Sequence, residues 1–137
     1  MYKKDLISKE LQKAAQAIDK ILGLKQEGKI EEAHDLIQQT FFEELELKNV
    51  NFDTVSVKDF ESLLKQKQYS DKHLDYIAQL LFESAHPFRE ADTGITNRLH
   101  LVLEVFNLLE TEHHVQLLEN ISKRDMIDNF LNNNQYE

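Results

Sequence analysis

Residues 23–37 read GLKQEGKIEEAHDLI and bring two charged segments with helical spacing together at one glycine, Gly28. The chain has only three glycines and one proline, so a glycine at this junction is informative. A glycine that follows a helix readily adopts the left-handed conformation that ends it. The stretch therefore predicts two antiparallel helices, over about residues 4–27 and 29–47, joined by a tight turn at Gly28.

Apolar residues recur every three or four positions on both sides of this turn, as they do on the buried face of a helix. The predicted inward-facing residues are Ile7, Leu11, Ala14, Ile18 and Ile21 before the turn and Ile30, Ala33, Leu36, Ile37 and Phe41 after it. Phe42 directly follows Phe41, and adjacent helical residues cannot both face one narrow core. We expect Phe42 to pack internally under a neighbouring hairpin, with exposure at a contact surface as the alternative.

The rest of the chain also predicts helices, over about residues 56–66, 70–85 and 95–110. Ser56, followed by Asp59, and Ser70 or Asp71 are suitable N-cap residues, and Pro87 ends the helix that precedes it. Residues 49–57, NVNFDTVSV, alternate like a strand, but no partner strand is evident, so we interpret them as a connector. Residues 113–131 predict one broken helix or two short ones, the last capped by Ser122.

The predicted fold class is all-α, with six to seven helices stacked as antiparallel hairpins. We expect a single domain over residues 1–131, because a chain of 137 residues has the usual size of one domain. The scarcity of glycine and proline agrees with a few long helices rather than many short strands. Residues 132–137, NNNQYE, form a polar tail that we expect to be disordered.

Residues 28–37 resemble the turn and second helix of a tetratricopeptide repeat (TPR). The glycine opens the second helix, and the small Ala33 stands where this family brings its paired helices close together. Ile30 and Ile37 take the positions of the family's Tyr and Phe. The preceding helix departs from the family, because Ile21 stands where a small residue is usual. The resemblance implies a TPR-like stack of helical hairpins.

The whole N-terminal pattern, from residue 5 to residue 33, also resembles a group of small uncharacterised bacterial helical proteins. Its elements are the apolar start of the first helix, the segment Ile21–Lys25 and the pair Glu32-Ala33. This resemblance implies a helical fold and carries no activity with it.

The composition excludes several classes of function. The chain has no cysteine, so it forms no disulfide, iron–sulfur cluster or Cys-ligated zinc site. The formal net charge of −9 disfavours binding to nucleic acid, because an acidic surface repels phosphates. No window approaches the length of apolar sequence that spans a membrane, and the start lacks a signal-peptide pattern. We therefore expect a cytoplasmic protein that binds neither nucleic acid nor a membrane.

The histidines give no clear chemical site. His100 and Glu104 are four residues apart, a spacing that can place two ligands on one metal. The same two residues belong with Thr96, Asn107 and Thr111 to a continuous polar stripe, which is typical of a solvated helix face. We interpret the stripe as that face, and we assign no catalytic, cofactor-binding or metal-binding residue and no cofactor.

The leading functional hypothesis is a non-enzymatic protein–protein interaction module, a scaffold or adaptor, because stacked helix pairs offer extended surfaces to peptides. We expect the partner to contact Asn97, His100, Glu104 and Asn107 on the fifth helix. An acidic chain favours a basic or amphipathic protein or peptide as that partner. The alternatives are a self-associating structural protein, hence a homo-oligomer, and a metal-dependent hydrolase with a helix-lined pocket.

Overall fold

The computed structural model describes the backbone of residues 2–135 and the side chains of residues 9 and 11–133. Within these residues there are six α-helices and no strand, so the all-α prediction is confirmed. The helices are α1 (Tyr2–Gln26), α2 (Ile30–Glu43), α3 (Val57–Lys67), α4 (Asp71–Ala85), α5 (Ile95–Glu112) and α6 (Leu118–Gln135). Residues 1–50 and residues 51–137 each form a compact unit.

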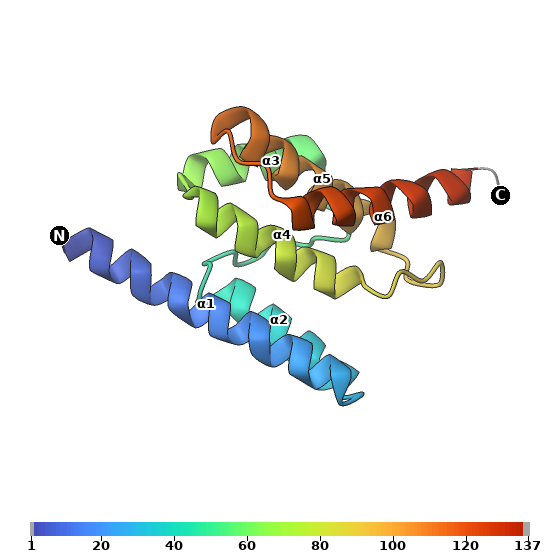
Figure 1. The fold of residues 1–137 in the computed structure, drawn as a ribbon, viewed down its shortest axis with the longest axis horizontal. Helices are drawn as coiled ribbons and strands as arrows, with labels where there is room; N and C mark the ends of the chain where they lie inside the picture. Colours follow the sequence, from blue (N-terminus) through green and yellow to red (C-terminus); the bar gives the residue numbers. More distant parts are fainter. Residues whose placement is uncertain (1, 136–137) are drawn as a thin grey trace. The chain divides into compact units, whose positions relative to one another are not determined.

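The first unit is the predicted hairpin, with α1 and α2 antiparallel and packed side by side (Figure 1). Gly28 has a φ of 80°, the left-handed conformation that the sequence predicts for it. Two backbone hydrogen bonds close the turn, from Gly28 N–H to the Lys25 carbonyl (3.1 Å) and from Lys29 N–H to the Leu24 carbonyl (2.8 Å). This pair of bonds is the Schellman arrangement, which satisfies carbonyls that would otherwise be left unpaired at the end of α1.

The two glycines of the hairpin predict opposite responses to alanine. Gly28→Ala places a side chain at positive φ and should lower the free energy of unfolding by about 1 kcal/mol. Gly23 lies inside α1, and an added Cβ there meets no atom within 4 Å. Gly23→Ala should therefore raise that free energy by about 1 kcal/mol, through helix propensity. Urea denaturation of the two variants measures both changes, and equal effects would contradict the different roles of the glycines.

The second unit begins with two capped helices. Ser56 Oγ accepts a hydrogen bond from Asp59 N–H (3.1 Å) at the start of α3, and Ser70 Oγ accepts one from His73 N–H (3.2 Å) at the start of α4. The predicted N-caps are confirmed, with Ser70 rather than Asp71 as the second. A side-chain oxygen at this position satisfies one of the unpaired N–H groups of the first turn. Helix α4 ends at Ala85, shortly before Pro87, also as predicted.

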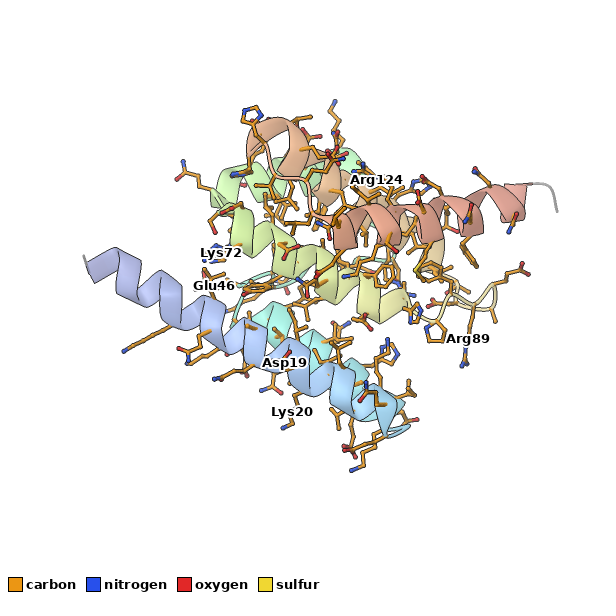
Figure 2. The ribbon with its side chains drawn as sticks, viewed as in Figure 1. Asp19, Lys20, Glu46, Lys72, Arg89 and Arg124 are labelled. Carbon is orange, nitrogen blue, oxygen red and sulfur yellow. The ribbon has the colours of Figure 1, made fainter. Side chains whose placement is uncertain are left out.

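The core of the second unit lies between α4 and α5, which pack antiparallel over most of their length (Figure 1). Phe60 of α3 and Phe106 of α5 are almost fully buried in it. Helix α6 joins this core through Arg124, which is labelled in Figure 2. Its guanidinium lies 2.8 Å from Glu110 and 5.7 Å from the centre of the Phe106 ring. An aromatic contact between Phe88 and Phe130, with ring centroids 5.4 Å apart, also ties α6 to the loop that follows α4.

Three sequence-based expectations differ from the structure. Helix α2 ends at Glu43, because Leu45 and Leu47 turn into the core in an irregular segment instead of continuing the helix. Phe42 is 52% exposed, so the expectation that it packs internally is wrong; the Lys48 ammonium lies 5.2 Å from its ring centre. Residues 118–135 form one helix, so Ser122 lies inside it and caps nothing.

Two organisational expectations stay predictions. The expected boundary of the polar tail at residue 132 falls within α6, which continues to Gln135, and residues 136 and 137 lie outside the described residues. The expectation of one TPR-like domain over residues 1–131 likewise stays a prediction. What the structure shows is antiparallel helix packing within each unit.

Candidate functional site

The four residues expected to meet a partner occupy different environments on α5. His100 and Asn107 are exposed, whereas Asn97 and Glu104 are half-buried. The Asn97 amide donates two hydrogen bonds of 2.8 Å, to the backbone carbonyls of Phe52 and Val55. Asn97 therefore fastens the connector before α3 to the start of α5. These two hydrogen bonds are enough to explain why residue 97 is polar, without contact to a partner protein.

Glu104 belongs to a charged network that links α3 with α5. Its carboxyl group hydrogen-bonds that of Glu61, and Lys65 Nζ lies 2.9 Å from Glu61 and 3.6 Å from Glu112. Burial, followed by the hydrogen bond to Glu61, raises the pKa of Glu104. The hydrogen bond between Lys65 and Glu61 lowers the pKa of Glu61. The same hydrogen bond raises the pKa of Lys65.

Replacing Glu104 with glutamine should flatten the acid side of the stability profile. A carboxyl group whose folded pKa lies above its ordinary value of 4.5 binds more protons in the folded than in the unfolded state. Its contribution to stability therefore falls as the pH rises from 4.5 through the folded pKa. Glutamine cannot ionise, and its amide can donate a hydrogen bond to Glu61. We expect Glu104→Gln to be at least as stable as the wild type at neutral pH.

Urea midpoints measured between acidic and neutral pH test this prediction, with Glu119→Gln as a control at an exposed carboxylate of α6. A loss of stability in Glu104→Gln at neutral pH would contradict it. That result would mean that the Glu104 charge is favourable, through Lys65, and that burial does not dominate its pKa.

An open hollow of about 530 Å³ lies beside this network, between α3, the start of α4 and the end of α5. Its floor is apolar and consists of Leu64, Leu74 and Leu108, each at most 4% exposed. Its rim is polar, formed by Lys65, Gln68, Tyr69, Glu112 and His113. A concave apolar surface with a few polar groups at its edge is the usual form of a binding site.

A serine–histidine contact at the edge of the hollow is structural. Ser70 Oγ lies 2.7 Å from His73 Nδ1, the distance expected of a nucleophile and its base. However, the same Oγ caps α4, and Ser70 N–H in turn points to His73 Nδ1 at 3.4 Å. Histidine here replaces the glutamate of a capping box, so the pair closes the start of a helix. The Tyr69 ring packs beside the imidazole, with centroids 5.4 Å apart.

Arg98 is the centre of a second cluster, which the sequence did not reveal. Its guanidinium contacts Asp92, lies 3.1 Å from Asp53, and donates to the Ser84 carbonyl at 2.7 Å. Only 11% of the side chain is exposed. The cluster ties together the connector before α3, the end of α4 and the loop that follows it. Gly94 is needed there, because an added Cβ would lie 2.1 Å from Asp53 Cγ.

The described side chains include no group of three or more His, Asp or Glu residues placed to hold a metal ion. Among the described residues, no helix combines the length and the apolar character that crossing a membrane requires.

The sequence analysis assigned none of the rim residues of the hollow to a site. Tyr69 and Gln68 lie in the turn between α3 and α4, and His113 follows the last residue of α5. These residues lie together only because α3 and α5 pack against each other. The apolar pattern of a single helix does not show which other helix it packs against. The available signal was the spacing of Glu61 and Lys65, four residues apart on one helix face.

No protein-family model, curated protein or solved structure matches the chain.

Proposed function

We propose that the chain is a non-enzymatic protein-interaction module that binds a segment of a partner protein in the hollow between α3, α4 and α5. The observation that carries this proposal is the hollow itself, about 530 Å³ with a leucine floor and a polar rim. Its volume lies within the range of known ligand-binding pockets. The resemblance of residues 28–37 to a TPR supports the same class by analogy, because stacked helical hairpins present surfaces to peptides.

A photo-crosslinking amino acid at His113 tests the proposal in living host cells. His113 lies on the rim and is exposed, so the substitution leaves the core intact. The same crosslinker at Asp128, an exposed position of α6 outside the rim, is the matched control. We expect a discrete adduct at His113 and none at Asp128. Mass spectrometry then identifies the crosslinked segment, and the synthetic segment should bind the purified chain.

Adducts of equal yield at both positions, or a captured segment that does not bind the purified chain, would contradict the proposed site. Adducts that contain only the chain itself would favour self-association instead.

Self-association is the second candidate, and exposed apolar side chains at the start of α6 favour it. Leu118 is 84% exposed, and Leu117 and Ile121 beside it are each more than a third exposed. Adjoining apolar groups of this kind often lie at interfaces. Sedimentation equilibrium should show a concentration-dependent mass that Leu118→Ser abolishes. A constant monomer mass would exclude this candidate.

A metal-dependent hydrolase is the third alternative, and no contact in the described residues favours it. Metal analysis of the protein, purified without chelators, tests it directly. A stoichiometric metal would place this alternative ahead of the interaction module.

A further inference from the structure

We infer that the segment bound in the hollow is basic and amphipathic: an apolar side chain rests on the leucine floor while a neighbouring Lys or Arg pairs with Glu112. This inference rests on the proposed function and names the chemistry of the partner. The inferred partner contact lies at the end of α5, where the hollow opens, and not on the polar stripe of α5 that the sequence suggested.

The floor of the hollow determines the apolar half of the ligand. Leu64, Leu74 and Leu108 come from three different helices, so their side chains form a surface that is fixed by the packing of the unit. Together with the carbon atoms of Lys65, Gln68 and Tyr69 around them, the leucines give the hollow an apolar lining, and the exposed part of that lining gains from being covered by another apolar group. A volume of about 530 Å³ exceeds that of a single side chain, which favours a turn of helix over an isolated residue.

The rim determines the charged half. Lys65 is engaged most closely by Glu61, at 2.9 Å, and its contact with Glu112 is longer, at 3.6 Å. Glu112 is also 54% exposed, so a ligand cation can approach it. Glu61 and Glu112 are two carboxylates that share one ammonium group, that of Lys65. A cationic group of the ligand would give Glu112 a second positively charged partner. An acidic segment would be repelled by the carboxylates.

Two model peptides separate these requirements. In the first, leucine and lysine follow each other with the spacing of an amphipathic helix; in the second, glutamate replaces every lysine. Fluorescence anisotropy measures the binding of each labelled peptide to the purified full chain. We expect the leucine–lysine peptide to bind and the leucine–glutamate peptide not to bind. A leucine-to-alanine version of the first peptide should bind more weakly, because it covers less of the apolar lining of the hollow.

Charge reversal in the protein locates the contact. Glu112→Lys should weaken binding of the leucine–lysine peptide at least about tenfold, because it removes the pairing group and adds repulsion. Glu119→Lys makes the same change in net charge at an exposed position outside the rim and should alter binding by less than about twofold. Both positions are exposed, so both variants should fold, and circular dichroism checks that they do.

Equal losses in the two variants would overturn the inference, since binding would then follow net charge alone. Binding of the leucine–glutamate peptide would overturn it as well. The crosslinking experiment tests the proposed function separately from this inference. A segment captured at His113 that lacks Lys and Arg would refute the basic ligand but would agree with the interaction module. Absence of any adduct at His113 would refute both.

Discussion

Replacing Arg98 with methionine is expected to lower the free energy of unfolding by about 3 kcal/mol, the lower end of the range for breaking a buried ion pair. The methionine keeps most of the apolar volume and removes the guanidinium. Asp53 and Asp92 then lose their cationic partner, and the Ser84 carbonyl loses its donor. The loss lies at the low end because the two carboxylates are partly exposed, at 52% and 34%, and water solvates them in the variant.

Urea denaturation measures this change, with Arg89→Met as the matched control. Arg89 is exposed in the loop after α4, and its side chain is visible in Figure 2. The control should change stability by no more than about 0.5 kcal/mol. Arg98→Lys should fall between the wild type and Arg98→Met, because an ammonium group cannot reach all the partners that a planar guanidinium reaches. Equal stability of Arg98→Lys and Arg98→Met would contradict this order and show that a positive charge without the planar guanidinium does not stabilise the cluster.

Local patterns in the sequence predicted the parts of the fold that depend on neighbouring residues. The turn at Gly28, the N-cap at Ser56 and the helix end before Pro87 each depend on side chains within a few positions of one another. Helical spacing also placed Ala33 and Ile37 in the core. Such features follow from backbone preferences and from the period of a helix, so a single sequence carries them.

Contacts between distant residues were not predictable in this way. Arg98 meets Asp53 across 45 positions of sequence, and no local pattern distinguishes it from other charged helix residues. The exposure of Phe42 depends on which residues pack against α2. The pattern of apolar residues within α2 does not show this. The hollow likewise requires the ends of α3 and α5 to meet. The polar stripe of α5 was recognised correctly as a pattern, but its members have different roles.

Replacing Asn97 with alanine is expected to lower the free energy of unfolding by about 2 kcal/mol while leaving partner capture at His113 unchanged. The substitution removes both donors from the Phe52 and Val55 carbonyls. Leaving one buried polar group unpaired costs about 1–3 kcal/mol, and water reaches this half-buried site in part. His100→Ala and Asn107→Ala, at exposed positions of the same stripe, should each change stability by less than about 0.5 kcal/mol.

Asn97→Asp separates lost donors from lost packing. Aspartate has the shape of asparagine, but its carboxylate accepts hydrogen bonds and would face two carbonyl oxygens, which also only accept. Asn97→Asp should therefore be at least as unstable as Asn97→Ala. If either variant reduced capture at His113 without reducing stability, Asn97 would contact the partner, and the binding surface would lie on the polar stripe of α5. If stability falls and capture persists, the residue holds the connector, and the hollow remains the binding site.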